Sequence, residues 1–313
     1  MELAELAVLV AERVQEEVRW RSLLLGYCHA HVANARRVAT DFDAADEAFA
    51  RALELWRAGQ EVEPYPLAEW RMPALEASLR RAQHQFPLAL ELLARALALC
   101  GKDPWARALI LLNREHVFNQ MGDLQGALAA LEEAVPWVEA AGDPRLNFAQ
   151  RFNRADNLCK QERYADAEAL LGKIRELAVQ QGSELTLIRV GWLASKVDAG
   201  QGRPDEAISG LEQVRRDFTV RGLPYEVALS SLDLALLWLR AGRRKEVRDL
   251  ALAMAWIFKA KKIHREALAA LSLFCEAAKQ EAATVELTQQ VIAEIERVRR
   301  SAPRAGDGSG GRE

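Results

Sequence analysis

Apolar residues recur along the chain at the three- and four-residue spacing that is typical of amphipathic helices. In the middle of the chain, small or β-branched residues stand 40 residues apart, at Ala127, Ala167, Ala207 and Val247. Four residues after each comes another apolar residue, at Leu131, Leu171, Leu211 and Ala251. Positions i and i+4 share one face of a helix. The pattern therefore predicts a helix that starts near each of these positions and buries the same face in every repeat.

Turn residues precede each of these helices. The segments 122–127, 162–167, 202–207 and 242–247 begin with Gly, or in one case Glu, and carry acidic residues before the Ala or Val in most repeats. Gly allows the left-handed cap of a preceding helix, and acids favour the start of the next one. A second kind of junction is marked by Asp103-Pro104, Asp143-Pro144, Ser183 and Pro224, which are typical of helix starts. The two junctions together predict two helices per repeat, each of roughly 15 to 20 residues.

The repeat continues in both directions with less regular spacing. Residues 86–89 and 42–45 occupy corresponding turns towards the N-terminus, and residues 61–73 form an insertion whose three prolines interrupt any helix. Towards the C-terminus, residues 282–285 open a last helix that ends near Arg300. We therefore expect one repeat array over residues 1–300, with about six helix pairs and a capping pair, followed by a disordered tail over residues 301–313.

These helix pairs, with small residues where helices cross and a Gly-Asp or Gly-Arg turn, resemble the tetratricopeptide repeat (TPR) over about residues 20–300. The usual repeat has 34 residues, so this chain resembles a longer variant. It looks most like the TPR portions of bacterial signalling regulators. The resemblance implies an all-α fold, an α-solenoid in which antiparallel helix pairs form a right-handed superhelix. It also implies that the first helix of each pair lines the concave side.

Ten residues are expected to line that concave groove when positions are counted back from the turns. They are His31, Asn34, Ser78, Asn113, His116, Asn153, Asp156, Arg189, Trp192 and Asp233. Asn113 and Asn153 occupy equivalent places one repeat apart, and a carboxamide can both donate to and accept from the backbone of an extended peptide. Arg189 could pair with a carboxylate. Structural alternatives stay open: either Asn could bond a helix end, Trp192 could pack in the core, and the histidines could be solvated.

Composition narrows the range of partners. The chain is 50 % hydrophobic and 28 % charged with a formal net charge of −3, so no overall field selects nucleic acid or an acidic membrane. Basic residues between positions 240 and 265 form two clusters, which we expect at opposite ends of one helix and therefore not as one continuous stripe. The acidic N-terminus does not resemble a secretory signal, and four widely spaced cysteines are expected to stay reduced. These features favour a cytoplasmic protein with no membrane span.

Catalytic and metal-binding patterns are absent from the sequence. It has no phosphate-binding loop, no His-Glu-x-x-His pair and no Gly-x-Ser-x-Gly segment. His29 and His31 point to different helix faces, whereas Cys28 and His31 share a face but supply only two zinc ligands. We therefore expect no enzyme activity, no metal and no cofactor.

The sequence as a whole favours a non-enzymatic protein–protein interaction scaffold that binds a peptide or a partner helix in its concave groove. Two alternatives stay open. One is a signal-sensing regulatory subunit of the peptide-receptor kind that acts on a separate effector. The other is a homo-oligomer whose groove is filled by its own terminus or by a second copy, with the apolar face of residues 1–18 as the candidate anchor.

Overall fold

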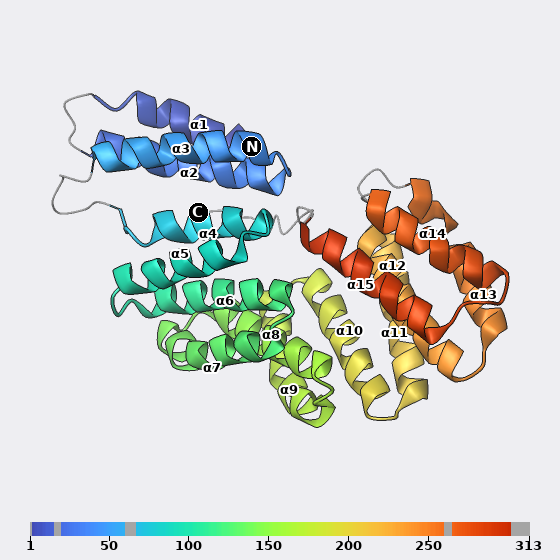
Figure 1. Cartoon of the computed structure of the whole chain (residues 1–313). Coiled ribbons are helices and arrows are strands. Elements are labelled where there is room, and N and C mark those ends of the chain that lie inside the picture. Colours follow the sequence, from blue (N-terminus) through green and yellow to red (C-terminus); the bar gives the residue numbers. More distant parts are fainter. Residues whose placement is uncertain (1, 16–19, 60–66, 260–264, 302–313) are drawn as a thin grey trace. The chain divides into compact units, whose positions relative to one another are not determined.

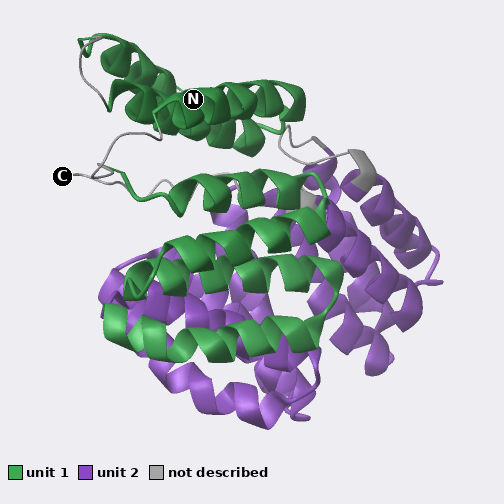
Figure 2. Ribbon diagram, turned by 60° about the vertical axis from the view of Figure 1, so that its left-hand side comes forward, with its two compact units in different colours: residues 1–141, 301–313 green, residues 142–300 purple. Residues whose placement is uncertain are grey.

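Every regular element that the structure describes is a helix (Figure 1). The structure is a computed structural model, and it describes residues 2–15, 20–59, 67–259 and 265–301. The helices fall into two compact units, residues 1–141 with 301–313 and residues 142–300, which are called unit 1 and unit 2 (Figure 2). The predicted all-α fold is confirmed.

Unit 1 holds the first seven α-helices. They are α1 (Glu2–Glu12), α2 (Arg21–Val38), α3 (Phe42–Ala58), α4 (Arg71–Ala82), α5 (Phe86–Leu99), α6 (Pro104–Met121) and α7 (Leu124–Ala141). Helices α2 and α3, α4 and α5, and α6 and α7 pack as consecutive pairs, while α1 packs against α2.

Unit 2 continues the same arrangement. It contains α8 (Pro144–Lys160), α9 (Tyr164–Gln181), α10 (Glu184–Gly200), α11 (Pro204–Val220), α12 (Pro224–Arg240), α13 (Arg244–Ala253), a 3₁₀ helix η1 (Ala255–Lys259), α14 (Arg265–Lys279) and α15 (Val285–Ser301). Helices α8 and α9, α10 and α11, and α12 and α13 form pairs, and α8 and α12 also contact α10. The first helices of successive pairs are therefore neighbours within this unit.

The small residues at the predicted crossings lie inside the structure. Ala127, Ala167 and Ala207 are completely buried, and Val247 is 1 % exposed. A short side chain at such a position lets two helix backbones approach closely, so the 40-residue spacing reports one repeated packing geometry.

The predicted turns and caps are also present. Gly122, Gly202 and Gly242 have φ values of 79°, 74° and 71°, in the left-handed region that a glycine enters at little cost. Glu162 occupies the equivalent turn with a φ of 58°. At the other junction, the Asp143 side chain accepts hydrogen bonds from the backbone N–H groups of the first turn of α8.

Each unit has its own apolar core. In unit 1, one cluster includes Leu23, Phe49 and Trp56, and another is centred on α4, α5 and α6. In unit 2, a large cluster extends from α10 to α15 and includes Phe218 and Phe274, both completely buried. A single helix pair cannot bury its apolar face alone, so each pair depends on its neighbours for a core.

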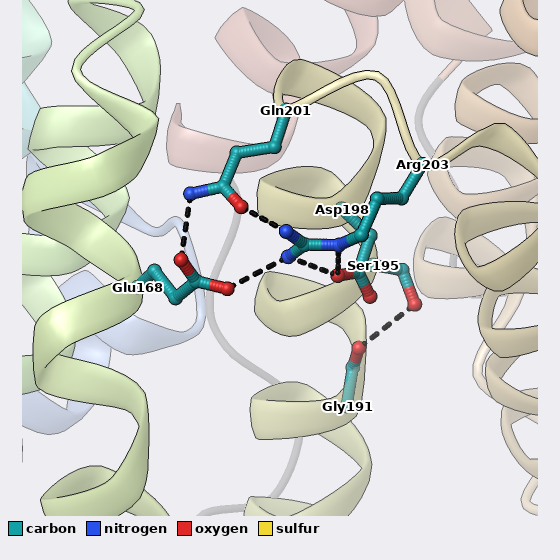
Figure 3. A network of polar contacts seen from close by, with 6 residues as sticks. All are labelled: Glu168, Gly191, Ser195, Asp198, Gln201 and Arg203. Carbon is teal, nitrogen blue, oxygen red and sulfur yellow. Dashed lines mark hydrogen bonds and ion pairs between the residues drawn. The ribbon is translucent and has the colours of Figure 1, made fainter.

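A polar network joins two successive pairs in unit 2 (Figure 3). Arg203, in the turn between α10 and α11, donates to Glu168 on α9 at 2.8 Å and to Asp198 on α10 at 2.6 Å. Gln201 also donates to Glu168 at 2.8 Å and accepts from Arg203. These hydrogen bonds lower the pKa of Glu168, so its carboxylate is ionised at neutral pH. The network links α9 to the turn between α10 and α11.

The structure differs from the sequence predictions at three places. The helix that starts at Arg244 ends at Ala253 and a 3₁₀ helix follows, so the two basic clusters are not at the ends of one helix. Both Met254 and Ile257 are completely buried, and the three-residue period of a 3₁₀ helix aligns these two side chains. Ser301 belongs to α15 rather than to the tail, and the rest of the predicted tail, 302–313, lies outside the described residues. Residues 61–66 of the predicted insertion also lie outside them, whereas Pro73 occupies the first turn of α4.

Candidate functional site

Three of the predicted groove residues come together in unit 2, each from the first helix of a different pair. Asp156 lies on α8, Trp192 on α10 and Asp233 on α12. The Trp192 indole Nε1–H donates a hydrogen bond to Asp233 Oδ2 at 2.7 Å. Lys196 Nζ lies 4.8 Å from the centre of the Trp192 ring, close enough for a cation–π interaction. Asp156 pairs with Lys160 Nζ at 2.8 Å.

The last helix of the chain adds an acid to the same region. The charge of Glu296, on α15, acts on both Lys196 and Asp233. α15 is held in place by Val291, Ile295 and Val298, which are at most 5 % exposed within the core of unit 2. We call the five residues Asp156, Trp192, Lys196, Asp233 and Glu296 the Lys196 cluster.

The charges in this cluster perturb one another. Burial alone would lower the pKa of Lys196, but the carboxylates of Asp233, Asp156 and Glu296 outweigh it, so the pKa is raised and the ammonium stays charged. Burial raises the pKa of Asp233; Lys196 and the Trp192 N–H offset this rise in part, whereas Glu296 and Asp156 add to it. The cluster thus holds several mutually dependent charges on partly buried side chains of four helices. Such groups can pair with the backbone or with charged groups of a ligand.

Trp192 contacts both the apolar core of unit 2 and other members of the Lys196 cluster. Its ring meets Phe218 edge-on at a centroid distance of 5.6 Å and packs against the large apolar core of unit 2. The side chain is partly buried, as are those of Lys196 and Asp233. The structural alternative for Trp192, packing in the core, is therefore part of its role. The polar contacts of Trp192 are the hydrogen bond from its indole N–H to Asp233 and the cation–π contact between its ring and Lys196.

The other two predicted residues of unit 2 lie on the same helices. Asn153 is partly buried on α8, and Arg189 is partly buried on α10. Their expected groove roles stay predictions.

Four of the five predicted residues of unit 1, His31, Asn34, Ser78 and His116, make local contacts. His31, on α2, meets the Tyr27 ring edge-on at 4.6 Å, and burial together with the charge of Arg71 lowers its pKa, so His31 is neutral at pH 7. Asn34 accepts a hydrogen bond from Arg37 Nε at 3.0 Å. Ser78, on α4, donates to the Ala74 carbonyl at 3.2 Å, which is a common bond within a helix.

Asn113 and His116 lie on α6, also in unit 1. Asn113 is partly buried. His116 Nδ1 lies 3.0 Å from an oxygen of Glu115. The carboxylate of Glu115, which is only 1 % exposed, also accepts from Asn119 at 3.1 Å. Asn113 and Asn153 belong to different units, so a joint role of the two stays a prediction.

Two members of the Lys196 cluster did not emerge from the sequence. Lys196 stands four residues after Trp192 and therefore shares its helix face, a signal that the sequence does carry. Glu296 carries no comparable signal, because its position depends on how α15 packs in unit 2.

Groups of metal ligands and membrane-spanning helices are the remaining features to look for in the described part of the chain. No group of three or more potential metal ligands occurs among the described residues. Burial raises the pKa of the Cys28 thiol, which disfavours the thiolate that zinc would need from the Cys28–His31 pair. Within the described ranges, none of the helices is both long enough and apolar enough to cross a bilayer.

Comparison with known proteins identifies the fold. No family model matches the sequence, and no curated protein is significantly similar to it. Among solved structures, the chain is similar to a Rap protein complexed with Competence and Sporulation Factor, with a TM-score of 0.64 and 12 % identity over 96 % of this chain and 84 % of that one. It is also similar to a tetratricopeptide repeat protein from Parabacteroides merdae, with a TM-score of 0.50 and 16 % identity over 84 % of this chain and 99 % of that one. The chain therefore has the tetratricopeptide-like fold of helix pairs.

Proposed function

We propose that unit 2 is a binding module for a peptide or a partner helix, and that the ligand contacts α8, α10 and α12 at the Lys196 cluster. One observation carries the proposal: predicted groove residues from these three helices, Asp156, Trp192 and Asp233, converge around Lys196. A few convergent polar groups within a mostly apolar wall are typical of ligand sites.

The parts of the cluster have different roles in this proposal. Lys196 and the carboxylates fix the register of the ligand through charge-assisted hydrogen bonds to its backbone or side chains. The ring of Trp192 gives an apolar surface, and a rigid aromatic group loses little conformational entropy when it is covered. Affinity then comes from apolar contact, and selectivity comes from the charges.

A likeness in structure supports binding of a partner. The similar Rap protein was solved in complex with Competence and Sporulation Factor, so a protein of this fold holds a partner. A signal-sensing regulatory subunit is the second candidate, and the same likeness favours it. A regulator, unlike a passive scaffold, is expected to change helices that do not touch the ligand when the ligand binds.

The proposal is tested by affinity measurements with peptides selected from a random library against the full chain. The variant Trp192→Phe keeps an aromatic ring but removes the donor to Asp233, and Lys196→Met removes the central charge. Each variant is expected to lower the affinity for the selected peptides by about tenfold or more, equivalent to the loss of about 1.4 kcal/mol of binding free energy. The matched control is Lys173→Met, which changes a more exposed lysine on α9 that pairs with Glu176.

The control variant is expected to bind as the unchanged protein does. Circular dichroism melting of all three variants separates loss of the site from loss of the fold. Equal affinity of the selected peptides for folded Trp192→Phe, folded Lys196→Met and the unchanged protein would contradict the proposal.

A further inference from the structure

The first helix exposes an apolar stripe. On α1, Leu3 is 83 % exposed, Leu6 is 52 % exposed and Val10 is 61 % exposed, and Leu9 beside them is 58 % exposed. Leu3, Leu6 and Val10 follow one another at spacings of three and four residues, so they line one side of the helix. Another side of α1 packs against α2 within unit 1, where Ala11 is only 2 % exposed. We call Leu3, Leu6 and Val10 the α1 stripe.

The stripe borders a shallow apolar hollow between α1 and α2. Ala7 and Ala11 of α1 and Leu24 and Cys28 of α2 form part of its lining, together with the stripe itself. A contiguous exposed apolar surface of this kind marks an interaction site in a water-soluble fold. A helix with larger apolar side chains at the same spacing would fill the hollow.

We infer that the occupant is the α1 helix of a second copy of this chain, packed antiparallel across a two-fold axis. Charge complementarity selects this occupant and this direction. Glu2 is the first residue of α1 and Arg13 directly follows its last residue, Glu12; both Glu2 and Arg13 are exposed. At 100° per residue they lie on the same edge of the stripe, because 11 residues correspond to about three turns.

In an antiparallel pair related by a two-fold axis, each edge faces the same edge of the other copy. Glu2 of one copy then meets the partner's Arg13, and Arg13 meets the partner's Glu2. Leu6 and Val10, which lie on either side of the midpoint between Glu2 and Arg13, meet each other across the axis. In a parallel pair, Glu2 and the partner's Arg13 would lie at opposite ends of the two helices, so neither ion pair would form.

The length of the helix sets the strength of the association. α1 has 11 residues and is therefore roughly 16 Å long, so two such helices bury less than the about 1,200 Å² at which stable specific interfaces begin. The dimer is therefore weak, and its population rises with protein concentration. The α1 stripe and the Lys196 cluster share no residue and no helix, so the two proposals are tested separately.

Sedimentation velocity of the full chain over a series of rising concentrations tests the apolar part. The unchanged protein is expected to shift from the mass of one chain towards that of two. The double variant Leu6→Glu/Val10→Glu is expected to keep the mass of one chain at the highest concentration, because it places four acids at the centre of the interface. Val220→Glu is the matched control: Val220 is 85 % exposed on α11, in unit 2, and its replacement is expected to leave the dimer unchanged.

Charge reversal tests the direction of packing. Arg13→Glu is expected to weaken the dimer several-fold, because the edge then carries only acids, and Glu2→Arg combined with Arg13→Glu is expected to restore it. All substituted side chains are exposed, and thermal melting verifies that the variants fold. An unchanged protein that keeps the mass of one chain throughout would overturn the proposal. So would a dimer that persists in Leu6→Glu/Val10→Glu, or a double reversal that fails to restore association.

Discussion

Lys196 and Asp233 have protonation states that depend on the charges around them. Both have a raised pKa, and Glu296 contributes to the rise in each case. For Lys196, the raised pKa contributes stability that is fully present below the ordinary lysine value of about 10.4 and is lost as the pH rises through the folded-state value. For Asp233, the raised pKa contributes stability only below the ordinary value of about 3.9, and this is lost as the pH rises through its folded-state value. Ionisation of Asp233 above its folded-state pKa therefore costs stability, and the contacts of Asp233 with Lys196 and Trp192 offset part of that cost.

Glu296→Gln is expected to lower the pKa of both Lys196 and Asp233, because the substitution removes a nearby negative charge and keeps the size of the side chain. Carbon-detected NMR titration of the Asp233 carboxyl group measures the change. Glu294→Gln is the matched control on the same helix, since Glu294 pairs with Arg297. An Asp233 pKa that responds equally to both substitutions would contradict the placement of Glu296 in the cluster.

The helices are bounded by residues whose backbone geometry explains the turns. Gly182, at the end of α9, has a φ of 65°, whereas Gly172, inside α9, has open space where a Cβ would lie. A left-handed turn position tolerates a side chain poorly, but a helix interior prefers alanine to glycine. Replacement by alanine should therefore have opposite effects on the stability of the fold at Gly172, inside α9, and at Gly182, directly after it.

Gly182→Ala is expected to lower the free energy of unfolding by about 1 kcal/mol, and Gly172→Ala is expected to raise it by about 0.5–1 kcal/mol. Urea denaturation of the full chain measures both changes. Each variant serves as the control for the other. Changes of the same sign would mean that the end of α9 is not built as described.

Much of the element scale could be predicted from the sequence, because turn and cap chemistry is local. The glycine turns and the capping acids act within a few residues of their own positions, so Gly122 and Asp143 indicated helix boundaries directly. The break after Ala253 could not be predicted in this way. No Pro or Gly marks it, and it accompanies the burial of Met254 and Ile257 in the core of unit 2.

The candidate site was predictable only in part. Asp156, Trp192 and Asp233 followed from counting along a regular repeat, which places equivalent positions on equivalent helices. Glu296 joins them only because α15 packs into the core of unit 2, and the sequence does not specify that docking geometry. The same counting cannot show that His31 turns its ring against Tyr27. Side-chain contacts between helices depend on packing rather than on periodicity.

At the scale of the whole molecule, the two proposals assign one surface to each unit. In these proposals, unit 2 binds a peptide or helix at the Lys196 cluster, and unit 1 associates with a second copy through α1. Because the two surfaces share no residue and no helix, loss of one activity through substitution is expected to leave the other in place.

Hydrogen–deuterium exchange of the full chain, with and without a library-selected peptide, tests the central claim most directly. Binding at the Lys196 cluster is expected to slow amide exchange in α8, α10 and α12, because a ligand held there suppresses local opening of these helices. Additional changes in α14, which carries no cluster residue, would favour the regulatory subunit over the passive scaffold. Tight binding with unchanged exchange in α8, α10 and α12, or protection confined to unit 1, would contradict the account.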